Sequence, residues 1–147
     1  MVLVHPQIPP NTGNIARTCA ATDTPLHLVA PLGFDISDKA LKRAGLDYWP
    51  YMDIHHYESV DDFQKRTKNS GRWIGFSKTG TVKYTDFTFK ENDWLLFGSE
   101  LYGLPDDIRN QCSSLVYIPM TGKHVRSLNL ASSAAVGLYE ARRQLGE

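Results

Sequence analysis

Three polar, glycine-bearing stretches hold the side chains of this sequence whose types and spacing could do chemistry. They span residues 6–17 (PQIPPNTGNIAR), 98–105 (GSELYGLP) and 119–129 (PMTGKHVRSLN). Each follows a short apolar run of the kind that forms a buried strand. Because strand ends in one parallel sheet converge, we expect the three stretches to form a single pocket.

The first stretch is predicted to open a helix. Asn11 can cap its first turn, and Gly13, Asn14 and Arg17 follow close behind. Free backbone N–H groups at a helix N-terminus, together with a guanidinium, favour a phosphate or a carboxylate as ligand. The alternative is that Asn11 only caps the helix and that Arg17 is only a surface charge.

The other two stretches leave similar alternatives open. Gly98 and Gly103 permit either tight turns or close approach of a ligand, with Glu100 between them as a candidate polar contact. A plain connection from strand to helix explains them equally well. Ser127 and Asn129 stand just before the final helix, where capping accounts for them as readily as binding does.

Two familiar kinds of site have no signature in the sequence. It contains neither a GxGxxG run nor a GxxxxGK[ST] run, which argues against the usual cradles for dinucleotides and phosphates. The two cysteines, Cys19 and Cys112, lack CxxC spacing, so we expect buried reduced thiols rather than a disulfide or a zinc site. No bound metal is expected.

Size and charge restrict the class of protein. A chain of 147 residues with 41% hydrophobic content suits one compact domain spanning residues 1–147. With 16 basic and 16 acidic side chains, the net charge is zero and the electrostatic field of the whole chain does not indicate a nucleic-acid partner. Basic clusters such as residues 65–68 are most simply interpreted as solvated surface. Neither a leader segment nor an apolar run of about 20 residues is evident, so we expect a cytoplasmic protein without a membrane partner.

The elements that must position the three stretches alternate along the chain. Strands are predicted at residues 1–4, 26–29, 51–57, 73–76, 94–97 and 115–118, with a half-exposed edge strand at 85–89. Helices are predicted from Asn11 with Ile15, Ala16, Cys19 and Ala20 facing inward, at 38–44, after a capping box of Ser59 and Asp62, from Pro105 to about Cys112, and over 130–145. This order predicts an α/β domain with a mainly parallel sheet flanked by helices.

Taken together and in this order, the three stretches resemble the motifs of the SPOUT superfamily, specifically its SpoU-like branch of RNA ribose 2'-O-methyltransferases. The resemblance covers nearly the whole chain. IPPNTGNIAR, AGLDY (44–48), the GLP after Glu100 and the closing SLNLASSAAVGLYEARRQL are most similar to the small tRNA (cytidine/uridine) enzymes that modify the wobble nucleotide. Ser99 stands where many of these have proline, and residues 121–126 vary among them, which bears on the nucleotide modified more than on the reaction.

The resemblance implies a trefoil knot in the C-terminal third, with S-adenosylmethionine as methyl donor bound against the knotted loops and tRNA as substrate. Donor contacts then fall on Phe76, Gly98, Ile118, Ser127 and Leu128. The catalytic side carries Arg17, Asn14, Glu100 and Asn129. A guanidinium with a pKa above about 12 is a reluctant base, so we expect Arg17 to grip RNA phosphate and to stabilise negative charge developing on the ribose oxygen.

A homodimer is expected, partly from the resemblance and partly from the final helix. Val136 and Tyr139 lie off its main apolar stripe, which suggests a second buried face, although packing on two sides within one chain is an alternative. Other hypotheses are a ribose methyltransferase acting elsewhere on tRNA or rRNA, a Rossmann-type enzyme, and a non-catalytic RNA-binding module. The missing GxGxxG run counts against the Rossmann-type enzyme.

Overall fold

The structure is a computed structural model that describes residues 1–37, 39–40 and 47–147. Most of the basic helix predicted at 38–44, and part of the AGLDY segment, lie outside the described residues. Within those ranges, no helix has the length and apolar character needed to cross a membrane.

A seven-stranded sheet forms the centre of the molecule. Its strands are β1 (Val2–Val4), β2 (Leu26–Val29), β3 (Ile54–Tyr57), β4 (Trp73–Phe76), β5 (Val82–Lys83), β6 (Trp94–Phe97) and β7 (Ser114–Tyr117). They lie in the order β3-β2-β1-β6-β4-β7-β5, and each recorded pairing of neighbours is parallel. The predicted parallel sheet is therefore confirmed.

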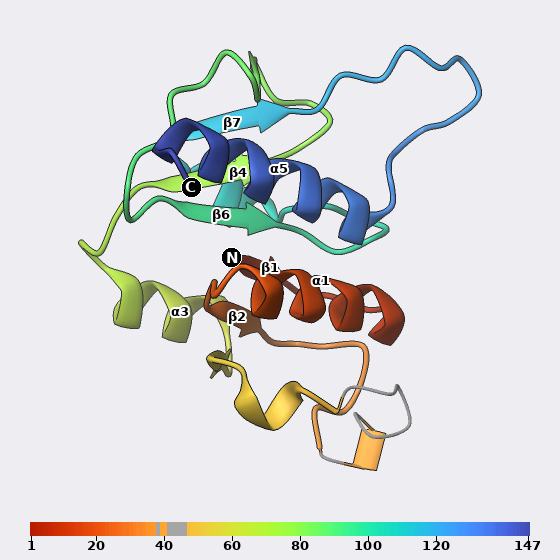
Figure 1. Ribbon diagram of the computed structural model, residues 1–147, viewed down its shortest axis with the longest axis vertical. Helices are drawn as coiled ribbons and strands as arrows, with labels where there is room; N and C mark the ends of the chain where they lie inside the picture. The colour runs from red at the N-terminus through yellow and green to blue at the C-terminus, as the bar shows by residue number, and fades with distance from the viewer. Residues whose placement is uncertain (38, 41–46) are drawn as a thin grey trace.

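Helices cover both faces of the sheet, because the buried strands carry apolar side chains on each side. Helices α1 (Pro9–Ala21) and α5 (Leu130–Leu145) pack beside each other on one face, in front of the strands in Figure 1. Helices α3 (Val60–Thr67) and α4 (Asp106–Arg109) bury Phe63 and Ile108 in a second apolar cluster with strand residues such as Val4 and Leu96.

Three details of the α1 prediction have different outcomes. Ile15, Ala16 and Cys19 are fully buried in the core, as expected, but Ala20 is exposed. Asn11 is not the cap: α1 begins at Pro9, after Ile8, and no side chain caps it. Proline suits the first turn because it has no N–H to leave unpaired, so the helix starts earlier and Asn11 becomes a buried residue within it.

The predicted edge strand at 85–89 is wrong, because this segment bonds to a helix instead of to a neighbouring strand. The Gln144 side chain of α5 accepts a hydrogen bond from the Phe89 N–H and donates one to the Phe87 carbonyl, both at 2.9 Å. Phe89 is buried beside α5, and the edge position belongs to β5. The strand predicted at 51–57 begins only at Ile54, since a 3-10 turn containing Pro50 (Trp49–Tyr51) precedes it.

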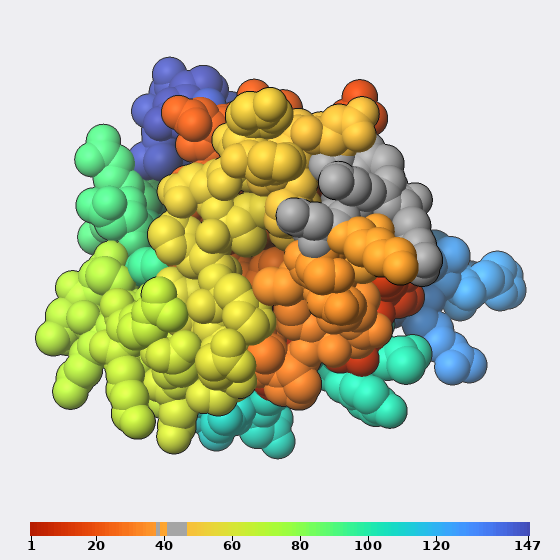
Figure 2. All heavy atoms as spheres, turned by 90° about the horizontal axis from the view of Figure 1, so that it is seen from below, coloured from red at the N-terminus to blue at the C-terminus, as the bar shows by residue number. Residues whose placement is uncertain are grey.

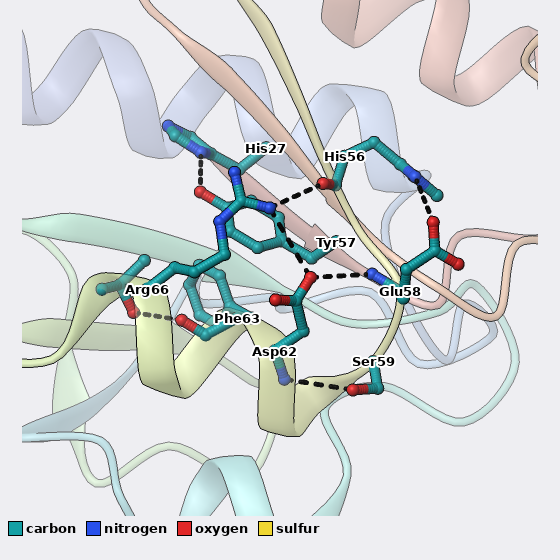
Figure 3. A network of polar contacts seen from close by, with 9 residues as sticks. His27, His56, Tyr57, Glu58, Ser59, Asp62, Phe63 and Arg66 are labelled. Carbon is teal, nitrogen blue, oxygen red and sulfur yellow. Dashed lines mark hydrogen bonds and ion pairs between the residues drawn. The ribbon is translucent and has the colours of Figure 1, made fainter.

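The capping box before α3 is confirmed in its main contact. Ser59 Oγ accepts a hydrogen bond from the Asp62 N–H at 3.0 Å, and Asp62 accepts one from the Glu58 N–H (Figure 3). The helix after Pro105 is shorter than predicted and ends at Arg109, so Cys112 lies beyond it and is only half-buried.

The strands of the C-terminal half do not lie in the sheet in the order in which they follow one another along the chain. Strand β4 lies between β6 and β7, and after β7 the chain returns so that α5 packs beside α1 and β6. The exposed loop 119–129 spans this return and projects from the body in Figures 1 and 2. The trefoil knot expected in this region stays a prediction.

Candidate active site

One pocket of about 760 Å³ opens at the carboxyl edge of the sheet, and all three predicted stretches line it. Its walls come from residues 76–79 at the end of β4, 97–103 at the end of β6, Ile118, Met120 and residues 127–130 around the last loop, and Ile8 with Asn11 from the start of α1. The convergence expected from the parallel order is therefore confirmed.

All five residues that the resemblance assigns to the donor line this pocket: Phe76, Gly98, Ile118, Ser127 and Leu128. Phe76 is nearly buried and stacks on Phe97 with ring centroids 4.5 Å apart, which gives the pocket a rigid apolar floor. Ile118 and Leu128 add apolar wall from the last loop. The set offers apolar surface with few polar groups, as small-molecule sites do.

Glu100, Asn11 and Asn129 bind one another in a network that we call the loop junction. The Glu100 carboxylate accepts hydrogen bonds from the Gln7 N–H at 2.8 Å, the Ile8 N–H at 3.0 Å and Asn11 Nδ2 at 3.3 Å. Asn11 Oδ1 accepts from Asn129 Nδ2 at 2.9 Å. The junction therefore ties the start of α1 to both other stretches.

Asn129 is also the cap of α5, which confirms the capping explanation offered by the sequence. Its Oδ1 accepts hydrogen bonds from the N–H groups of Ala131 at 2.8 Å and Ser132 at 3.3 Å, while its Nδ2 reaches Asn11. The amide thus uses both ends. Because of this, the direction of α5 is coupled to the position of the first loop.

Gly98 is required by a tight turn. A Cβ at this position would lie 1.9 Å from the Gly103 carbonyl carbon, so the loop could not close on a larger residue. Ser99 and Gly103 exchange backbone hydrogen bonds at 2.9 and 3.2 Å, and Gly103 adopts a positive φ of 67°. Between the alternatives of tight turn and ligand approach, the geometry favours the turn.

Asn14 and Arg17 do not line the pocket of their own chain. Both are exposed on α1. On the same helix, the Gly13 carbonyl accepts a hydrogen bond from the Tyr48 hydroxyl at 3.2 Å. Burial raises the pKa of Tyr48, and the positive charge of Arg17 partly offsets this rise. The structure therefore brings Glu100 and Asn129 together but leaves Asn14 and Arg17 on the outer side of the helix.

Sequence reasoning missed several pocket residues: Ser77, Lys78, Thr79, Leu101, Tyr102 and Arg109. The first three follow β4, so the strand-end rule applied to that strand would have found them. Leu101 and Tyr102 lie within a predicted stretch, but their apolar character gave no reason to single them out. Arg109 has no signal of its own, because α4 carries it to the pocket from outside the three stretches.

Neither cysteine of the chain lines the pocket. Burial raises the pKa of both the Cys19 and the Cys112 thiol to about 11, so neither forms a thiolate near neutral pH. Among residues 1–37, 39–40 and 47–147, no group of three His, Cys, Asp or Glu side chains could hold a metal ion.

Comparisons with known proteins agree with this geometry. The profile of the SpoU rRNA Methylase family matches residues 1–139. A protein of Synechocystis sp., provisionally named tRNA (cytidine(34)-2'-O)-methyltransferase, is 59% identical over 99% of this chain and 95% of its own length. The tRNA (cytidine(34)-2'-O)-methyltransferase of Methylovorus glucosotrophus is 47% identical over 98% of this chain and 94% of its own.

Solved structures show the same similarity. One described as giving insights into the 2-OH methylation of C/U34 on tRNA has a TM-score of 0.91 and 47% identity, covering 99% of this chain and 94% of its own. The AdoMet-bound rRNA methyltransferase of Sinorhizobium meliloti has a TM-score of 0.86 and 28% identity, covering 98% of this chain and 55% of its own.

Proposed function

This chain belongs to the SpoU rRNA Methylase family, and from that premise we propose that it methylates the 2'-hydroxyl of the wobble nucleotide of tRNA, cytidine or uridine 34, using S-adenosylmethionine. The observation that carries the proposal is the loop junction, which assembles all three motif stretches around one pocket. Sequence identity of 47–59% over nearly whole chains to proteins named for this reaction supports the choice of nucleotide.

The residues of the pocket fit this donor. S-adenosylmethionine supplies a methyl group on a sulfonium, and the sulfur keeps the bonding electron pair when the group leaves. Phe76, Ile118 and Leu128 offer the apolar surface that an adenosine ring needs, and Ser127 offers polar contacts beside them.

The ribose oxygen must gain a bond to carbon and lose its proton, which passes to water or to a nearby base. Much of the rate can come from holding the oxygen in line with the methyl group. Glu100 and Asn129 act as positioning residues, because their polar atoms already bind other parts of the loop junction. Arg17 grips an RNA phosphate and stabilises negative charge on the oxygen.

The working unit is a homodimer in which Arg17 and Asn14 serve the partner's pocket. Three facts support this: both are exposed, neither lines its own pocket, and α1 lies beside α5. On α5, Val136 is 38% exposed and Tyr139 is 55% exposed, so the second apolar face is not covered within the chain. Val136→Glu should yield folded monomers that have lost tRNA methylation, whereas sedimentation of the unaltered protein as a fully active single chain would rule out the dimer.

The direct test incubates the protein with S-adenosylmethionine and unmodified total tRNA, followed by digestion and mass spectrometry. We expect 2'-O-methylcytidine or 2'-O-methyluridine at position 34. A methylated ribose elsewhere in tRNA, or methylation of rRNA alone, would show that nucleotide 34 is not the site of modification. Calorimetry with the donor separates these outcomes from a non-catalytic RNA-binding module, which would give neither heat nor product.

Arg17 tests the catalytic half of the proposal. Arg17→Ala should lower the methylation rate by about 100-fold or more while leaving donor affinity within about twofold, since we place Arg17 on the RNA side. Arg17→Lys should keep the shape of the pH–rate profile if the residue is not the base. We also propose that the enzyme works in the cytoplasm, where it would meet tRNA, and that the chain forms a trefoil knot around the donor loops, as the family resemblance implies.

A further inference from the structure

Arg109 is held in place by neutral groups that do not cancel its charge. Its Nη1 donates to Ser77 Oγ at 2.8 Å and its Nη2 donates to Thr79 Oγ1 at 2.9 Å. Those two hydroxyls lie 3.1 Å apart on the turn that leaves β4. The guanidinium is therefore fixed at the wall of the pocket with several N–H donors still available.

Four other arginines of the chain lie beside carboxylates. Arg66, Arg72, Arg142 and Arg143 each have a carboxylate oxygen within 4.0 Å. Among the described residues, Arg109 has none at that distance. A guanidinium that is oriented but not paired is what an anion-binding site requires.

The charged side chains that line the pocket beside Arg109 are positive on balance. Lys78 lines the same pocket and is exposed, while Glu100 is the one acidic residue among the pocket's described lining. The Glu100 carboxylate already accepts three N–H groups in the loop junction. Asp106 and Asp107 are exposed on α4, but neither has an oxygen within ion-pair distance of the guanidinium, and Asp107 bonds the Ile108 N–H at 2.9 Å.

Beside these cations, a rigid turn presents two large apolar side chains to solvent. Leu101 is 81% exposed and Tyr102 is 88% exposed, yet both line the pocket. The turn is fixed by the Ser99–Gly103 backbone pair and by the Tyr102 N–H, which donates to Ser99 Oγ at 3.1 Å. An aromatic ring held outward on a fixed backbone is suited to stacking against a planar group.

We propose that Arg109, Lys78 and Tyr102 form an RNA-docking lip on the donor pocket: the two cations bind backbone phosphates and the Tyr102 ring stacks on a base of the same strand. This inference rests on the proposed function and deepens it by naming where the chain holds its substrate. Phosphate contacts with aromatic stacking are the combination by which proteins hold single-stranded RNA, such as an anticodon loop. With a net charge of zero, the chain depends on such local contacts to hold RNA.

The test measures tRNA binding by fluorescence anisotropy over a salt series, using unmodified tRNA that the unaltered protein methylates. Arg109→Gln keeps a hydrogen-bonding side chain beside Ser77 and Thr79 but removes the charge. We expect it to weaken tRNA binding by about 5- to 30-fold, and to reduce the slope of log K against log salt by about 0.7–0.9. Lys78→Gln should reduce the slope by a similar amount.

Tyr102 is tested with a matched pair. Tyr102→Ala should weaken tRNA binding by about 5- to 100-fold, as expected for losing a stacked base, without changing the salt slope. Tyr102→Phe keeps the ring and should bind normally. Lys90→Gln is the charge control: Lys90 is exposed near the amino ends of β4 and β6, away from this pocket, and its loss should leave both affinity and slope unchanged.

Two outcomes would contradict the RNA-docking lip while leaving the proposed methylation of tRNA intact. If the unaltered protein methylates tRNA but Arg109→Gln binds it with the same affinity and salt slope, the lip is not an RNA contact. If Arg109→Gln instead weakens calorimetric binding of S-adenosylmethionine more than tenfold and spares tRNA binding, Arg109 holds the donor's carboxylate. If the unaltered protein methylates no tRNA at all, the proposed function itself fails.

Discussion

The loop junction and a cluster around His27 both join segments that are distant in the sequence, but the junction lies at the open pocket and the cluster lies within the sheet. The His27 stack consists of His27, His55, Tyr57 and Trp94. His27 is 8% exposed in the middle of β2, its ring stacks on His55 at 4.5 Å, and Trp94 meets its ring at 4.7 Å. Its Nδ1 lies 3.0 Å from the Tyr57 hydroxyl (Figure 3).

The two networks differ in what they join. The His27 stack joins the neighbouring strands β2 and β3 to Trp94 of β6, which lies beyond β1 in the sheet, so its members keep their positions as long as the sheet exists. The loop junction connects segments beyond the strand ends, where no ladder fixes the chain. We infer that the junction determines the shape of the pocket, whereas the stack contributes to stability alone. Four predictions test this contrast.

The largest effect is expected when the backbone of the Glu100 turn is disrupted. Gly98→Val places a branched side chain against the Gly103 backbone, so the turn must open and donor binding should fall below detection by calorimetry. The far side of the sheet should remain intact, which the near-UV circular dichroism of the Trp73 and Trp94 region reports. Normal donor affinity in this variant would show that the turn does not form part of the donor site.

Loss of the junction's carboxylate should affect activity more than stability. Glu100→Ala frees the Gln7 and Ile8 N–H groups and should lower kcat/KM for tRNA methylation by about 100-fold, because reactants are displaced by about an ångström. Glu100→Gln keeps one carbonyl acceptor and should recover part of the rate. A drop in thermal stability as large as that of a core variant, with unchanged kcat, would show that the junction serves stability and not the shape of the pocket.

Acid should destabilise the protein through the His27 stack. Desolvation by burial lowers the pKa of His27 to about 3, with smaller contributions from the nearby N-terminal, His55 and Arg66 charges. The unfolded chain takes up this proton near pH 6.5 while the folded chain does not, so stability falls as pH decreases from about 6.5 toward 3. Between pH 7 and pH 5 this one group should cost about 2 kcal/mol.

Urea unfolding at several pH values checks this prediction, with a double variant as control. His27→Phe with Tyr57→Phe replaces both hydrogen-bond partners by apolar rings of similar shape and should flatten the pH dependence. His55 remains beside Asp53, with Nε2 2.8 Å from Oδ1, in both proteins. An equally steep dependence in the double variant would assign the effect to other groups.

The smallest effect is expected at the rim of the stack. Arg66 lies over the Tyr57 ring at 4.5 Å, donates to the His56 carbonyl at 3.3 Å and lies 3.6 Å from Asp62 (Figure 3). Because it is exposed, Arg66→Gln should lower the free energy of unfolding by less than about 1 kcal/mol and leave methylation unchanged. A loss of activity here would show that the two networks are coupled.

Much of the fold followed from local patterns. The apolar runs of four residues became strands within a residue or two, and the Ser59 capping box formed as expected. On α5, Ala134, Leu138 and Ala141 pack into the core, whereas Leu145 is exposed. The errors arose where a distant segment competed for the backbone: Gln144 took the hydrogen bonds of residues 87–89, and Pro9 started α1 before Asn11. Sequence patterns report local preference, and tertiary contacts override it.

By itself, the sequence determined which residues are apolar at strand and helix spacing, and hence a parallel sheet with three polar stretches at its carboxyl edge. The tertiary structure alone decided that Glu100 binds the first loop across 93 residues, that Asn129 reaches Asn11 across 118, and that Arg109 enters the pocket. The physical reason is that such pairings depend on the path of the chain between them. Sequence spacing predicts contacts within one helical turn or one strand, but it does not predict which residues meet when they are much farther apart along the chain.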